Sequence, residues 1–150
     1  MEWEIYEYER GEEGLKYWFY SEGPRGWIKK GVNFQWMRGL GESTFNLAFG
    51  DFVGNSNQLD DRSVSNNLDR LKVLHTVAAI GIEFLTKRPR SIIFIKATSE
   101  ARARLYQIMI SSIWNKIERL YEVQGKHGVY WIPFVKGVNY REFIVYKKIA

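Results

Sequence analysis

Carboxylate and carboxamide side chains are concentrated in one stretch of the chain, at Asp51, Asn55, Asn57, Asp60, Asp61, Asn66, Asn67 and Asp69. Mg²⁺ and Ca²⁺ prefer such oxygen ligands in proteins. The spacing matches no calcium-binding loop, because the repeated acidic pattern with its central glycine and closing glutamate is missing. Aspartate and asparagine also hold loop backbone and cap helices. We prefer this second interpretation and predict no metal site.

A second group of candidates stands at the start of a predicted helix, at Thr98, Ser99, Arg102 and Arg104. Residues 87–119 carry eight basic and two acidic groups, a net charge of +6. Cations at a helix N-terminus oppose the helix dipole, so Arg102 is expected to meet an anion. The sequence leaves two anionic partners for Arg102 open. One is a bound phosphate, held together with backbone N–H groups of the helix. The other is the carboxylate of Asp61 or Asp69, which would clip the preceding loop to the helix.

The remaining reactive side chains offer little catalytic chemistry. The chain has no cysteine, which excludes disulfides, thiolate metal sites and a cysteine nucleophile. His75 is interpreted as a packed or capping residue of a helix, and His127 as a solvated turn residue. With two separate histidines and no Gly-x-Ser-x-Gly motif, neither a hydrolytic triad nor a zinc site is predicted. Glu83 lies among apolar residues where burial could raise its pKa, although we prefer a structural role.

The net charge of +5 is unevenly distributed. Residues 1–22 have a net charge of −5, and residues 23–150 have a net charge of +10. This asymmetry predicts a basic face suited to nucleic acid or to an acidic protein partner. Aromatic side chains of the early strands, near Arg25, Lys29 and Lys30, could stack on bases, although most of them are expected in the core. The alternative is that the negative charge of residues 1–22 balances basic neighbours within the fold.

Length and composition indicate how many domains the chain forms and which class of protein it belongs to. A chain of 150 residues with 45% hydrophobic and 16% aromatic residues predicts one folded domain over 1–150. Met1–Arg10 contains no apolar run, so no signal peptide is expected. The longest apolar stretch, Val73–Leu85, is interrupted by polar residues and is too short to span a bilayer. We therefore expect a cytoplasmic protein with no membrane partner.

Hydropathy periods predict the elements that position these candidates. Period-two alternation between turn signals predicts strands over 3–9, 15–21, 27–36 and 44–51, joined as an antiparallel meander. A loop of about fifteen residues follows, and Asn66 or Asn67 is a good N-cap after it. The remaining elements are two main helices over about 68–87 and 99–124, a buried strand over 91–97 between them, and strands over 129–135 and 140–146. The predicted fold class is α+β, with a mixed, mainly antiparallel sheet in the order β-β-β-β-α-β-α-β-β.

Short motifs spread over nearly the whole chain resemble those of a family of small bacterial proteins of unknown function. The motifs are Phe49-Gly50-Asp51, Asp60-Asp61, Ser65-Asn66-Asn67-x-Asp69, Lys72-Val73-Leu74-x-Thr76-Val77-Ala78 and Ala101-Arg102-x-Arg104-Leu105-Tyr106. This resemblance implies no activity.

The order of elements is similar to that of the N-acetyltransferase-like (acyl-CoA transferase) fold, without the two helices that this fold usually inserts after its first strand. The segment Thr98–Tyr106 resembles the helix of that family that carries a Leu-Tyr pair. The resemblance implies acetyl-CoA or coenzyme A as cofactor, and Tyr106 as the acid that protonates the departing thiolate. The segment Asn66–Lys72 departs from the family pattern, because it has no glycine and places Asp69 where phosphates would lie.

Three functions stay open from the sequence. The first, which the sequence favours, is a binding module that uses a basic face for nucleic acid or an acidic protein and needs no cofactor. The second is an acyl-CoA-dependent transferase, with Tyr106 as catalytic acid and the backbone near Leu68–Leu71 holding the cofactor. The third, implied by resemblance alone, is a toxin-like or regulatory protein of a defence or mobile-element system. The candidate binding residues are Asp51, Asp61, Asn66, Asn67, Asp69, Lys72, Thr98, Ser99, Arg102 and Arg104.

Overall fold

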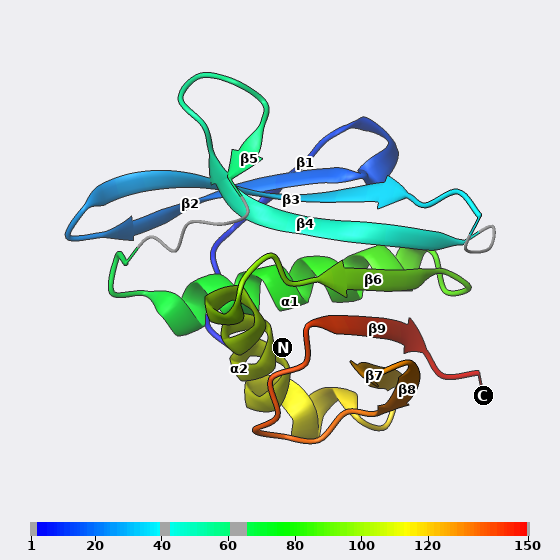
Figure 1. Cartoon of the computed structure of the whole chain (residues 1–150). Coiled ribbons are helices and arrows are strands. Elements are labelled where there is room, and N and C mark those ends of the chain that lie inside the picture. The colour runs from blue at the N-terminus through cyan, green and yellow to red at the C-terminus, as the bar shows by residue number, and fades with distance from the viewer. Residues whose placement is uncertain (1–2, 40–42, 61–65, 150) are drawn as a thin grey trace.

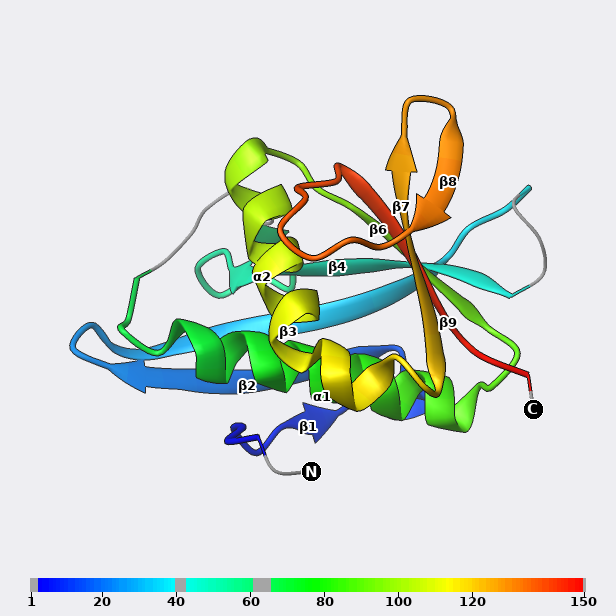
Figure 2. The ribbon, with the colours of Figure 1, turned by 90° about the horizontal axis from the view of Figure 1, so that it is seen from below.

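A computed structural model describes residues 3–39, 43–60 and 66–149. Within these residues the chain forms an α+β fold with a mixed, mostly antiparallel sheet of nine strands, which confirms the predicted fold class. The strand order is β1-β2-β3-β4-β6-β9-β7-β8, and β5 pairs with β4. Both helices lie on the same face of the sheet (Figures 1 and 2). The strands are Glu9–Arg10 (β1), Lys16–Gly23 (β2), Gly26–Trp36 (β3), Thr44–Phe52 (β4), Leu59–Asp60 (β5), Ile92–Lys96 (β6), Tyr121–His127 (β7), Tyr130–Pro133 (β8) and Glu142–Lys147 (β9).

The predicted meander forms as β2, β3 and β4, which pair antiparallel in sequence order. Alternate residues of each strand face the first helix, α1 (Arg70–Lys87), and build the core with it. The ring of Phe34 on β3 stacks on that of Phe84 on α1, with centroids 3.9 Å apart. No helix formed by the described residues lies on the opposite face of these strands (Figure 1).

The predicted strand over 3–9 is wrong except at its last residue, Glu9, which begins β1. The preceding residues lie along α1 instead. The backbone N–H of Tyr6 donates to Thr76 Oγ1 at 2.9 Å, and Tyr8 Oη donates to Glu83 Oε1 at 2.8 Å. The alternation of aromatic and charged residues therefore serves packing against a helix, which hydropathy alone does not distinguish from packing in a sheet.

The second helix, α2, spans Glu100–Ile117 and ends seven residues before its predicted limit. The following segment forms β7, a strand that the prediction assigned in part to the helix. Tyr121, Val123 and Gly125 lie on its buried face, in the period of two that a strand requires. At Gly125 an added Cβ would lie 2.3 Å from the ring of Tyr140, so only glycine leaves room for that ring.

The chain crosses from β4 through α1 to β6, which pairs parallel to β4 over three residue pairs, from Thr44↔Ile92 to Asn46↔Phe94. The other edge of β4 is occupied by β3 over nearly its whole length. Farther along, β5 pairs with β4 at Asp51 and Phe52. Because a strand has two edges, β5 and β6 share one edge of β4 and leave a gap between them.

Candidate functional site

The gap on the edge of β4 is the first part of the site. Leu47, Ala48, Phe49 and Gly50 pair with no strand on this edge within the described residues. A pocket of about 220 Å³ opens here, lined by Asn46, Leu47, Ala48, Phe49, Lys96, Ala97, Thr98 and Tyr106. Successive residues of a strand point to opposite faces. A lining that includes consecutive residues of β4 therefore indicates a pocket that passes between the strands.

Tyr106 closes this pocket from α2, on the helix side of the sheet. The residue is 4% exposed, and its ring meets the ring of Phe143 edge-on with centroids 6.2 Å apart. Two adjacent residues of the pocket, Ala97 and Thr98, lie where the chain leaves β6 and enters α2. Tyr106, which the resemblance implied as the catalytic acid, therefore lies where the parallel strands β4 and β6 separate.

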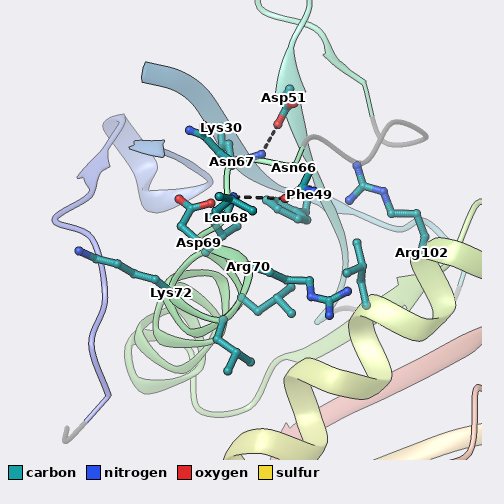
Figure 3. A pocket seen from close by; sticks show the side chains of 14 residues that line it. Lys30, Phe49, Asp51, Asn66, Asn67, Leu68, Asp69, Arg70, Lys72 and Arg102 are labelled. Carbon is teal, nitrogen blue, oxygen red and sulfur yellow. Dashed lines mark hydrogen bonds and ion pairs between the residues drawn. The ribbon is translucent and has the colours of Figure 1, made fainter. Parts of the chain in front are cut away.

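The second part of the site is a larger cleft of about 730 Å³ at the beginning of α1 (Figure 3). Its lining residues are Lys30, Phe49, Asp51, Asn66, Asn67, Leu68, Asp69, Arg70, Leu71, Lys72, Val73, Leu74, Arg102 and Leu105. Phe49 lines both this cleft and the pocket beside Tyr106, so the two cavities adjoin. Four of the lining residues are cations and two are carboxylates, which favours an anionic ligand.

The beginning of α1 is held by Asn67, which is 2% exposed. Its Nδ2 donates to Ser21 Oγ at 3.0 Å and to the carbonyl of Gly26 at 2.9 Å, and its Oδ1 accepts from the backbone N–H of Arg25 at 2.7 Å. Neither Asn67 nor Asn66 is the N-cap that the sequence predicted, because Asp69 occupies that position. Asn67 instead anchors the segment before the helix on the hairpin of β2 and β3.

The carboxylate of Asp69 makes no capping hydrogen bond to α1. Its Oδ2 accepts from Tyr6 Oη at 2.6 Å and from Ser21 Oγ at 2.5 Å. Burial, followed by the hydrogen bond to Asp69, raises the pKa of Tyr6 above its ordinary value. The Asp69 carboxylate therefore bonds towards β2 rather than to the N–H groups of the first turn, and it also lines the cleft.

Leu68 takes the backbone conformation that the missing glycine would supply. Its φ is +60°, in the left-handed region that non-glycine residues seldom adopt. The segment also passes so close to β2 that a Cβ on Gly23 would lie 2.0 Å from the carbonyl oxygen of Asn67. The chain therefore reaches a glycine-like turn before α1 without a glycine at the turn itself.

Two of the cations in the cleft are buried. Lys30 is 5% exposed, and its Nζ lies 2.6 Å from Asp51 Oδ1. Arg102 is 2% exposed; its Nη2 donates to the carbonyl of Asp60 at 3.2 Å, and its guanidinium carbon lies 5.1 Å from the ring centroid of Phe49. Arg102 therefore connects α2 with β5, as a clip would, while also lining the cleft. Asp61, one of the two carboxylates proposed for that clip, lies outside the described residues.

The other candidates divide between the cavities and the surface. Lys72 Nζ points away from the cleft, to Glu4 at 3.2 Å and to the ring of Tyr6 at 4.2 Å (Figure 3). Ser99 caps α2, because its side chain accepts from the backbone N–H of Arg102 at 3.1 Å, as predicted for this position or Thr98. Arg104 is exposed and lines neither cavity.

From the sequence, only the backbone near Leu68–Leu71 was expected to hold the cofactor, and the side chains of Leu68 and Arg70, which line the cleft, were not singled out. Arg70 is exposed in the first turn of α1, with its guanidinium group directed towards α2 (Figure 3). A basic residue in a first helical turn is unfavourable unless it meets an anion, and this rule could have identified Arg70 as readily as Arg102.

Glu83 lies outside the cleft, and the alternative of a pKa raised by burial is wrong in direction, whereas the preferred structural role agrees with its hydrogen bonds. Hydrogen bonds from the Arg10 guanidinium group, at 2.8 Å and 2.7 Å, lower the pKa of Glu83 to about 2 against the opposing effect of burial. Burial and the bond to Glu83 raise the pKa of Tyr8 to about 12. His75 Nε2 lies 3.0 Å from Ser112 Oγ, between α1 and α2, and burial lowers the pKa of this imidazole. These groups hold elements together.

The chain belongs to DUF6934, a family of unknown function whose model matches residues 2–148. No curated protein and no solved structure matches the chain. Among the described residues, no cluster of three His, Asp or Glu side chains could hold a metal ion. No helix formed by these residues is long and apolar enough to cross a membrane.

Proposed function

We propose that this member of a family of unknown function is an acyl-CoA-dependent transferase of the N-acetyltransferase-like type. One observation carries the proposal, namely the separation of parallel strands β4 and β6 beyond Asn46, beside the buried Tyr106. In open sheets with parallel strands, ligands bind in the crevice at the carboxyl ends of strands whose connections diverge. The order β4-β6-β9-β7 supports the resemblance in the sequence, because it places this crevice at the centre of the sheet.

The two cavities suit the two ends of coenzyme A. The cleft at the beginning of α1 has a net positive lining and helix N–H groups for phosphates. Among the described residues, no strand pairs with Leu47–Gly50 on the gap side of β4, and the backbone groups that face this side suit the two amide groups of the pantetheine arm. The thioester would then lie in the adjoining pocket, near Tyr106.

The chemistry of the pocket is acyl transfer. The acceptor nitrogen would attack the thioester carbonyl, a C–N bond would form and the C–S bond would break. Tyr106 Oη would give its proton to the departing thiolate, while the acceptor nitrogen releases its own proton to solvent or to the acceptor's surroundings. The buried position of Tyr106 suits this role, since water is excluded from the thiolate.

Calorimetric titration with coenzyme A and acetyl-CoA tests the proposal, together with the variant Tyr106→Phe. Binding of both ligands to the native protein is expected, and the variant should bind acetyl-CoA with similar affinity while losing acyl transfer to amines. Tyr140→Phe is the matched control, because it removes a phenolic hydroxyl outside both cavities. If neither coenzyme A nor acetyl-CoA binds at millimolar concentration, the proposal is refuted.

A second candidate is a binding module for nucleic acid or an acidic protein partner. It is favoured by the face of the sheet without helices, where Tyr20 and Trp27 are exposed with ring centroids 6.0 Å apart. Lys29 Nζ lies nearby, 5.8 Å from the ring of Trp18. Aromatic rings beside cations are a common surface for single-stranded nucleic acid. Binding of an oligonucleotide that weakens with added salt, and is lost in Trp27→Ala, would support this candidate over the first.

A further inference from the structure

An apolar cavity of about 50 Å³ lies within the core, between α1, α2 and the sheet. Apart from Gly81, Met109 and Tyr121, the side chains that line it are aliphatic. One water molecule needs about 10–15 Å³ of such space, but it also needs two or more polar partners. Protein interiors contain few voids larger than a water molecule. An apolar group placed in this cavity would therefore gain contacts that the core leaves unused.

Gly81 keeps part of this space open. It lies in the interior of α1, where glycine destabilises a helix relative to alanine. Its backbone is helical, so its conformation does not require glycine. An added Cβ would meet Ile93 Cδ1 at 3.8 Å, which is an ordinary van der Waals contact. Neither backbone conformation nor steric crowding explains this glycine, whereas a ligand that uses the space would explain it.

The cavity continues the pocket beside Tyr106. Leu47 lines both spaces. On α2, Met109 of the cavity follows Tyr106 of the pocket by about one helical turn. At the end of β6, Ile95 of the cavity and Ala97 of the pocket are two residues apart and both buried, on the same face. A chain that enters past Tyr106 therefore reaches the cavity along the same elements that build the pocket.

We propose that this cavity binds the aliphatic chain of a ligand, which enters through the pocket beside Tyr106. The cavity site does not depend on the proposed function, whereas the assignment of the chain to the acyl group of the donor rests on it. With that assignment, the donor is a thioester with an acyl group longer than acetyl, because an acetyl group would leave the cavity unused. Each methylene group that the cavity buries should increase the affinity by about fourfold.

Hexanol, hexanoyl-CoA and acetyl-CoA separate the chain from the rest of the donor in a binding experiment. Hexanol is uncharged, so the cations of the cleft do not contribute to its binding. Each compound is titrated calorimetrically into the native protein, into Gly81→Ala and into the control variant Thr86→Ala. Hexanol is expected to bind the native protein. Hexanoyl-CoA is expected to bind more tightly than acetyl-CoA and to compete with hexanol.

Gly81→Ala separates binding from folding because its two expected effects have opposite signs. The added methyl group should raise the melting temperature, since alanine favours the helix and fills part of the cavity. It should weaken hexanol and hexanoyl-CoA by about fourfold, the contribution of one buried methylene group, and leave acetyl-CoA unchanged. Thr86→Ala also raises the helix propensity of α1, but Thr86 is exposed and lies outside the cavity. This control should leave all three affinities unchanged.

Methyl NMR spectroscopy locates the bound chain. Six isoleucines among the described residues line the cavity, and their δ1 methyl signals should shift when hexanol is added. Ile28 and Ile149 line neither the cavity nor the pocket, and their signals should stay in place.

The possible results are distinguishable. Absence of hexanol binding, or an affinity for hexanol that is unchanged in Gly81→Ala, would overturn the cavity site. Binding of acetyl-CoA in the same experiment would still leave the transferase proposal in place. Equal affinities for hexanoyl-CoA and acetyl-CoA would overturn the assignment of the chain to the donor. Hexanol binding that depends on Gly81, without binding of either thioester, would support the cavity site and refute the transferase.

Discussion

Replacement of Glu83 by glutamine tests how the N-terminal segment is attached to α1. The Glu83 carboxylate accepts two hydrogen bonds from Arg10 and one from Tyr8, and its pKa falls from 4.5 to about 2. A shift of this size corresponds to about 3 kcal/mol of stability if it is fully realised. Because Arg10 is about half exposed, solvent screening reduces the expected loss in Glu83→Gln to about 1–2 kcal/mol near neutral pH.

The sign of the pH dependence follows from the lowered pKa. A carboxylate with a depressed folded-state pKa stabilises the protein fully above its unfolded value of 4.5, and this contribution is lost as the pH falls towards about 2. Urea denaturation of the native protein and of Glu83→Gln, at several pH values from 7 to 3, measures the difference. The exposed Glu12, replaced by glutamine, serves as the control and should change stability little. The electrostatic account is refuted if the two proteins have the same free energy of unfolding at pH 7, or if the difference between them stays constant down to pH 3.

Two further predictions concern the residues that hold the cleft. Arg102→Ala should lower the free energy of unfolding by about 1–3 kcal/mol, because it removes the connection between α2 and Asp60. An unchanged melting temperature in this variant would exclude the clip. Asn67→Ala should cost about 2–4 kcal/mol, since a buried side chain loses one buried and two partly buried hydrogen bonds. Asn66→Ala should cost about 1 kcal/mol or less because its bond is exposed. Equal melting temperatures for the two asparagine variants would contradict the anchoring role of Asn67.

The sequence by itself determined the elements whose signals are local. The meander of β2, β3 and β4 follows from alternating side chains and the turn at Gly23–Gly26. The helix α1 follows from its apolar rows, and the start of α2 follows from a serine cap. Each of these signals lies within a few residues along the chain, where backbone geometry alone decides the outcome.

Local signals failed where the same pattern suits two environments. Residues 3–8 alternate as a strand does, yet they pack on α1. Tyr121–Gly125 belongs to β7, although the prediction placed part of it in the second helix, which ends at Ile117. The alternative of a raised pKa for Glu83 failed for a related reason. Its apolar neighbours in sequence suggested burial alone, whereas Arg10, 73 residues away, determines its charge.

Only the tertiary structure decided the site. The gap on β4 exists because two strands from different parts of the chain pair with the same edge and leave Leu47–Gly50 between them. The turn before α1 depends on Asn67 and Asp69 bonding to residues that lie 41 to 63 positions away. No propensity of Leu68 predicts its left-handed backbone, because these distant hydrogen bonds outweigh the local preference.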